Sequence, residues 1–183
     1  MIKSNNTIPR DMLDILRACK GQKMEDILFA KLGDKSSFEI IVLRFHDCDI
    51  ELWNLEQPDK EGGVSDLAKI IVKQNYNKDC SFPYEERDIN GIVRQKDLDI
   101  LHVNRKVVGI TVYNELIQWT YEDKRFLLAN TYAIVISLGK RFLHLTKMSE
   151  WSEIWDVSFH RTAVPKKPIW DESEKVSYSS IEL

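Results

Sequence analysis

The sequence predicts an α+β protein with one mainly antiparallel sheet of about seven to nine strands, strongly twisted or partly closed, and two helices packed on one face. Between residues 98 and 160, β-branched and aromatic residues crowd into short segments. Polar breaks of hairpin length separate these segments at 104–106, 122–124 and 138–140. A chain of 183 residues with only 7 Gly and 5 Pro is long enough to bury such a sheet without disulfides.

The strands expected from this pattern occupy most of the second half of the chain and a hairpin near its start. Residues 38–45 and 50–55 should pair, because a short turn separates two apolar runs. Residues 24–32 fit either a helix or a strand, and we prefer a strand from Ile27. The remaining expected strands are 98–103, 107–113, 115–121, 125–128, 132–137, 141–147 and 154–160.

Two stretches show helical spacing. The first begins near Pro9, which suits a first turn, and Gly21 is available to end it. Its apolar residues recur one helical turn apart at Met12, Ile15, Leu16 and Cys19. The second expected helix spans residues 65–75, with Ser65 as its cap. Breakers across residues 76–90 predict a long loop there.

We expect residues 1–163 to form a single α+β domain and residues 164–183 to form a mobile C-terminal tail. The tail is rich in serine and charge, so it contains little apolar surface to offset the entropy lost on ordering. Two prolines, Pro165 and Pro168, mark where its composition changes.

Composition and charge point to a soluble cytoplasmic protein. The formal net charge of -3 gives the whole molecule no attraction for nucleic acid or for anionic membranes. Cys19, Cys48 and Cys80 form no CxxC pair, which favours reduced thiols over a disulfide framework. No apolar run is long enough for a membrane span, and no nucleotide-binding motif is present, so no cofactor is implied.

Two histidines lie in apolar strand segments. His102 and His144 are each followed two positions later by a polar residue that should share their face, Asn104 and Thr146. The His-x-Thr pattern at His144 resembles the half-motif of two-histidine phosphoesterases. The resemblance implies that one imidazole acts as a base, the other as an acid, and the hydroxyl helps to hold phosphate. A phosphoester hydrolase using His102 and His144 is therefore one functional hypothesis, and ordinary hydrogen-bonded strand histidines are the other interpretation.

The segment from His46 to Glu51 gathers several potential metal ligands. In an extended chain His46 and Cys48 would share one face and the three carboxylates the other, so one metal ion would not collect them all. Aspartates are also typical of hairpin turns. We therefore expect a solvated turn here and assign no metal site.

The leading functional hypothesis is a small cytosolic, non-catalytic binding or inhibitory protein, immunity- or adaptor-like, that acts through a protein–protein interface. Aromatic residues dominate binding hot spots, although they are equally frequent in cores. The expected partner is another protein, and the mild acidity of the chain favours a basic one over a membrane or a nucleic acid. The candidate contact residues are Glu150, Trp151, Glu153, Trp155, Asp156 and Trp170.

Overall fold

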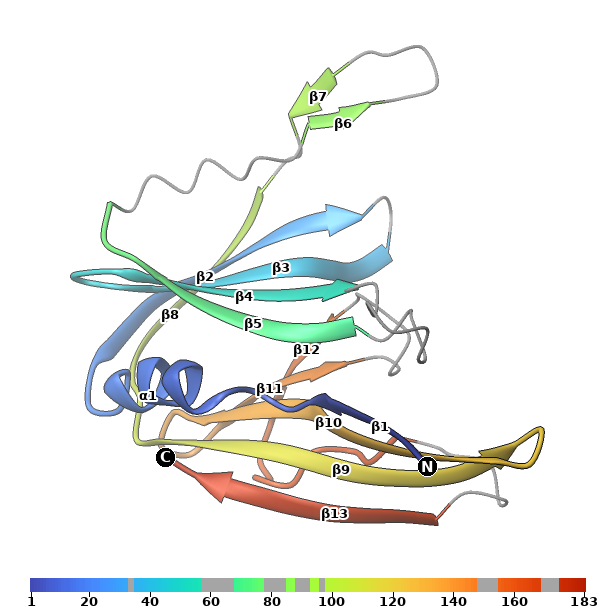
Figure 1. Ribbon diagram of the computed structural model, residues 1–183. Coiled ribbons are helices and arrows are strands. Elements are labelled where there is room, and N and C mark those ends of the chain that lie inside the picture. The colour runs from blue at the N-terminus through green and yellow to red at the C-terminus, as the bar shows by residue number, and fades with distance from the viewer. Residues whose placement is uncertain are drawn as a thin grey trace.

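The computed structural model describes residues 1–32, 35–56, 68–77, 85–87, 93–95, 98–147, 155–168 and 175–183. Within these residues, hydrogen bonds connect eleven strands, and the strands form two layers that face each other (Figure 1). This arrangement corrects the predicted fold class. The described chain is mostly β with a single helix, and not a single sheet with two helices on one face.

The upper layer in Figure 1 is a five-stranded antiparallel sheet in the order β8-β2-β3-β4-β5. The preferred strand interpretation of residues 24–32 is confirmed by β2, and the predicted pairing of residues 38–45 with 50–55 is confirmed by the ladder between β3 and β4. The strands are β2 (Lys23–Leu32), β3 (Lys35–Phe45), β4 (Asp49–Glu56), β5 (Ala68–Asn75) and β8 (Leu98–Lys106).

The lower layer follows the order β13-β9-β10-β11-β12. One further strand, β1 (Ile2–Asn6), pairs in parallel with the first half of β10. The second half of β10 pairs with β11. The single register pair between Trp155 and Phe38 links the two layers within the described residues. The strands are β9 (Gly109–Tyr121), β10 (Lys124–Ser137), β11 (Phe142–Lys147), β12 (Trp155–His160) and β13 (Lys175–Glu182).

Strands β9 and β10 are longer than the sequence indicated, because each joins two of the expected segments. The register of β10 shifts between Thr131 and Ala133, so the strand continues through an irregularity rather than ending. The two residues that connect β9 to β10, Glu122 and Asp123, both have positive φ values, 46° and 61°. Two such residues suit the right-handed twist of the flanking strands, so the predicted tight turn is confirmed.

The main core lies between the two layers. Alternate residues of the upper strands, such as Ile41 and Leu43, face alternate residues of the lower strands, such as Ile134 and Ile136. All four are at most 1% exposed. Because strand side chains alternate between faces, one set from each sheet fills this space and the other set points outward.

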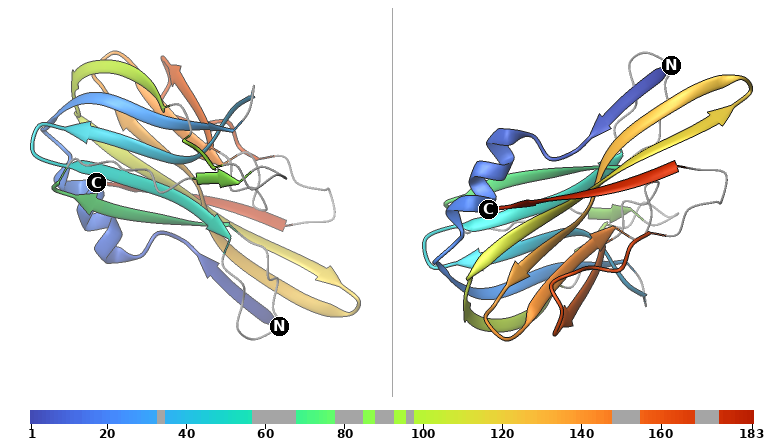
Figure 2. Two further views of the ribbon diagram at one scale, coloured as in Figure 1. Left: turned by 90° about the horizontal axis from the view of Figure 1, so that it is seen from above. Right: turned by 90° about the horizontal axis from the view of Figure 1, so that it is seen from below.

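Helix α1 (Arg10–Ala18) confirms the first helical prediction. Its Leu16 is fully buried in the main core, and the backbone N–H of Val72 in β5 donates to Sδ of Met12 at 3.4 Å. Figure 2 shows that α1 stands at one side of the two layers, close to the C-terminus. There, Nζ of Lys20 donates to the carbonyl of Leu183 at 3.2 Å. In the described part of the chain, no helix has the length and apolar character to span a membrane.

The second predicted helix, residues 65–75, is wrong where the structure describes it, because residues 68–75 form β5. Ile70 and Val72 point into the core, whereas the next residue, Lys73, is exposed on the other face, as expected for a strand. The run of β-branched residues favours a strand, and pairing with β4 along eight residues outweighs the local helical spacing. Residues 65–67 lie outside the described part.

The last described residues form an ordered edge strand. β13 pairs with β9 over eight register positions, and Leu183 is only 7% exposed. This part of the expected mobile tail is therefore docked on the lower layer. In the expected loop at 76–90, a short strand β6 (Glu85–Arg87) pairs with β7 (Val93–Gln95), and most other residues of that loop lie outside the described part.

Candidate functional site

Residues 161–168 cross the outer face of the lower layer, and we call this segment the strap. Between the strap and the outward side chains of β11 and β12 lies a pocket of about 790 Å³. The outward side chains are those that alternate with the core residues Leu143, Leu145 and Trp155. The pocket is lined by His144, Thr146, Lys147, Asp156, Ser158, His160, Val164, Pro165, Lys166, Lys167 and Pro168.

Three contacts hold the strap on the sheet. Nε2 of His144 lies 2.8 Å from the carbonyl oxygen of Thr162. The hydroxyl of Tyr113 donates to the carbonyl of Ala163 at 3.0 Å. The ammonium of Lys167 lies over the ring of Tyr178, 4.4 Å from its centre, as a cation–π contact. The strap is thus fixed to β9, β11 and β13.

Two imidazoles meet in the strap pocket. The ring centres of His144 and His160 are 4.3 Å apart. His144 is 3% exposed, and burial lowers its pKa below the ordinary value of 6.5, although the carbonyl of Thr162 acts in the opposite direction. Nε2 of His160 lies 2.9 Å from Oγ of Ser158, whose hydroxyl lies 3.5 Å from the carboxylate of Asp156.

A buried polar chain begins at the wall of the same pocket. Nζ of Lys147 donates to Oδ1 of Asn130 at 3.0 Å, and Nδ2 of Asn130 donates to Oε1 of Glu115 at 2.9 Å. All three residues are at most 3% exposed. Burial of a charged group is costly without hydrogen bonds and an opposite charge, and this chain supplies both.

The two histidines of the hydrolase hypothesis line different pockets. His102 lies on β8 in the upper layer, where its Nδ1 is 2.7 Å from Oδ1 of Asp26 on β2. His144 lies on β11 in the lower layer, beside Thr146 as the sequence predicts. Its neighbour is His160, which the sequence reasoning did not single out. The signal that could have identified it is the alternation of Asp156, Ser158 and His160 along one strand, which places the three side chains on the same face.

The predicted binding residues fall into three groups. Trp155 is fully buried in the main core, so its indole belongs to the interior. Asp156, the next residue, points to the opposite face and is exposed at the strap pocket. Glu150, Trp151, Glu153 and Trp170 lie outside the described residues.

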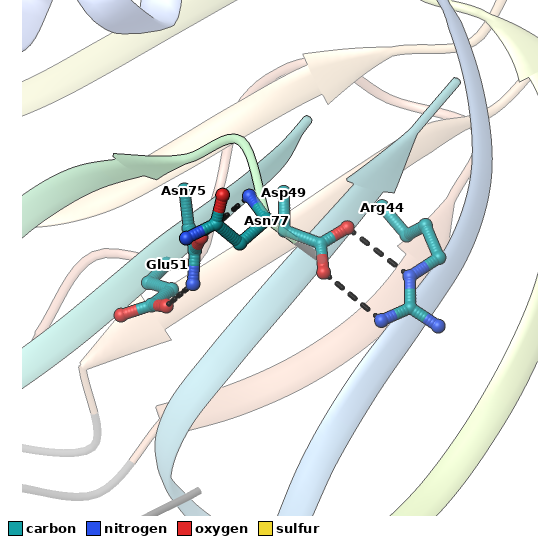
Figure 3. Close-up of polar contacts among 5 residues, drawn as sticks. All are labelled: Arg44, Asp49, Glu51, Asn75 and Asn77. Atoms are coloured by element: carbon teal, nitrogen blue, oxygen red, sulfur yellow. Dashed lines mark hydrogen bonds and ion pairs between the residues drawn. The ribbon is translucent and has the colours of Figure 1, made fainter. Parts of the chain in front are cut away.

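Residues 46–48 connect β3 to β4, which confirms the turn interpretation, but the expectation that the carboxylates here are solvated is wrong for Asp49, which is fully buried. The buried carboxylate of Asp49 accepts two hydrogen bonds from the Arg44 guanidinium, at 2.9 and 3.1 Å (Figure 3). Nδ2 of Asn75 donates to Glu51 at 3.0 Å. Within the described residues, no three His, Cys, Asp or Glu side chains are grouped so that they would hold a metal ion.

A second pocket, of about 830 Å³, opens on the side of the molecule opposite the β5 edge, and we call it the side cleft. Strand β8 forms one wall, and its described ladder involves only β2. Two apolar side chains remain partly exposed here, Leu101 at 37% and Phe159 at 39%. The cleft is lined by Leu101, His102, Val103, Arg105, Leu138, Lys140, Arg141 and Phe159.

Comparisons with protein families, with curated proteins and with solved structures gave no match to this chain. The described residues form two sites of different character. The strap pocket is open to solvent and bordered by the strap, and it combines imidazoles, hydroxyls and ammonium groups. The side cleft combines an edge strand with apolar and cationic side chains.

Proposed function

We propose that the protein is a small cytosolic, non-catalytic binding protein, adaptor- or inhibitor-like, that engages another protein through the side cleft. The observation that carries this proposal is the edge strand β8 beside partly exposed Leu101 and Phe159. An edge strand offers backbone N–H and C=O groups to an extended segment of a partner. Apolar side chains next to that edge provide the surface whose burial stabilises a complex.

The charge around the side cleft favours an acidic segment as the bound part of the partner. Arg105, Lys140 and Arg141 are exposed at the cleft, and none of the described residues that line it carries a carboxylate. Complementary charge mainly raises the association rate and suppresses wrong partners. The basic partner expected from the net charge would instead meet the 150–156 region, most of which lies outside the described residues.

The test compares two purified variants with the unmodified protein as baits in extracts of the native host. The cleft variant carries Phe159→Asp and Arg141→Glu. The matched control carries Arg125→Glu on β10, an exposed arginine that does not line the cleft. A specific partner should bind the unmodified protein and the control, and should lose at least about a hundredfold in affinity for the cleft variant, as expected for an interface hot spot.

Two results would contradict the proposal. Equal binding of the partner to the cleft variant and to the control would place the interface elsewhere. Phosphodiester hydrolysis by the purified protein that is abolished by His144→Ala would support the hydrolase hypothesis in place of the binding function.

A further inference from the structure

The strap pocket is a positively charged site on an acidic protein. Its described lining residues include Lys166 and Lys167 of the strap and one carboxylate, Asp156, which gives a formal charge of +1 before either histidine is protonated; Lys147 is not counted, because its buried ammonium is held by the chain through Asn130 to Glu115. The whole chain carries a formal charge of -3. Pockets lined by one sign of charge concentrate ligands of the opposite sign, so this pocket favours an anion.

Hydrogen-bond donors from several elements line the same pocket. Hydroxyls come from Thr146 on β11 and Ser158 on β12, and the two imidazoles come from the same pair of strands. The strap contributes the exposed ammonium of Lys166 from the opposite side. A tetrahedral phosphate group accepts hydrogen bonds from several directions, whereas a planar carboxylate does so mainly in one plane.

We propose that the strap pocket binds the phosphate group of a small phosphorylated molecule. Lys166, Ser158 and His160 are the residues assigned to contact the phosphate. The pocket volume of about 790 Å³ lies within the range of small-molecule sites, so it accommodates an organic group beside the phosphate. Val164, Pro165 and Pro168 of the strap supply the apolar surface for that group. This site is separate from the side cleft and does not depend on the proposed protein–protein function.

A lysine of the strap that is already held in place supports the assignment. Lys167 is held over the ring of Tyr178. Positive groups that are already held in place lose little entropy on binding, which favours the bound anion.

The histidines add a dependence on pH. His144 faces His160 and Asp156 on β12 and the carbonyl of Thr162 in the strap. A bound dianion favours the protonated form of a neighbouring imidazole. Binding should therefore take up protons and become tighter as the pH falls from 8 towards 6, as linkage requires.

The test measures binding of phenyl phosphate to the full-length protein by calorimetry and by NMR of the histidine ring protons. Benzoate serves as a planar anion with the same ring, and inorganic phosphate serves as the free anion. The variants are Lys166→Gln and His160→Ala, and the matched control is Lys140→Gln, which removes an exposed lysine of the side cleft. Phenyl phosphate should bind at least about tenfold more tightly than benzoate, and each pocket variant should weaken it by about tenfold or more.

The proposal gains support if the control binds as the unmodified protein does. Inorganic phosphate that binds as tightly as phenyl phosphate also supports it and identifies the free anion as the ligand. It is overturned if benzoate binds equally well, if Lys166→Gln and His160→Ala have no effect, or if a dinucleotide phosphodiester binds more tightly than the monoester. Lys166 is exposed, so Lys166→Gln should fold normally. Its result therefore tests the proposal even if His160→Ala does not fold.

Discussion

The two edges of the upper layer differ in what lies against them. At the β5 edge, α1 packs Leu16 into the core, and Met12 accepts a hydrogen bond from the Val72 N–H. At the β8 edge the described residues leave a cleft, in which Leu101 and Phe159 are more than a third exposed. Among the described residues, one edge of the sheet is therefore packed against a helix, and the other borders a cleft.

This difference teaches how the same apolar residue acquires different roles in a packed helix and in an edge strand. Leu16 and Leu101 have the same side chain, but one is fully buried and the other is 37% exposed. The transfer of apolar surface from water stabilises the fold only where neighbours cover that surface. An exposed apolar residue beside an edge strand keeps this free energy available for a partner.

The largest expected effect is the contrast between Leu16→Ala and Leu101→Ala. Leu16→Ala should lower the free energy of unfolding by about 3 kcal/mol, because it removes buried methyl groups and leaves a cavity. Leu101→Ala should cost less than about 1 kcal/mol, because its side chain is already partly solvated. Urea unfolding of the two variants measures both values. Equal losses would show that the side cleft is as well packed as the α1 side.

The second comparison uses histidines, one buried under the strap and one exposed. Burial lowers the pKa of His144 in the folded protein below 6.5, so the unfolded state binds more protons near that pH. Stability should therefore fall as the pH drops below about 6.5, and recover as it rises. His144→Gln should flatten this dependence, because glutamine keeps a donor for Thr162 but does not titrate.

The pH series is measured by urea unfolding between about pH 5 and 8, with His46→Gln as the control. The side chain of His46 is 86% exposed at the β3–β4 turn, so this variant controls for the loss of an imidazole from the surface. Identical slopes for His144→Gln and the unmodified protein would assign the pH dependence to other groups.

The smallest expected effect concerns hydrogen exchange at the two edges. Met12→Ala removes the acceptor of the Val72 N–H and should speed exchange of that amide by about tenfold, as expected for the loss of one modest hydrogen bond. The Leu52 amide, in the middle of the sheet, provides the control. Amides of β8 that do not pair with β2 should already exchange rapidly in the unmodified protein. Slow exchange there would mean that the side cleft is covered.

The sequence alone determined most of the strands, because alternation and turn chemistry act over a few residues. The apolar run of β3, the tight turn at Glu122 and Asp123, and the stripe of α1 all carry local signals that the structure bears out. It also predicted the turn at His46, since aspartates next to a strand end favour one.

Other features were decided only by the tertiary structure. Ile70 and Ile71 fit helical spacing locally, and only the ladder with β4 made that segment a strand. Trp155 and Asp156 looked like one surface patch, but pairing of β12 placed the indole in the core and the carboxylate outside. The strap pocket likewise required β11, β12 and residues 161–168 to meet. Pairing and layering depend on contacts between residues far apart in the chain, which a local pattern does not encode.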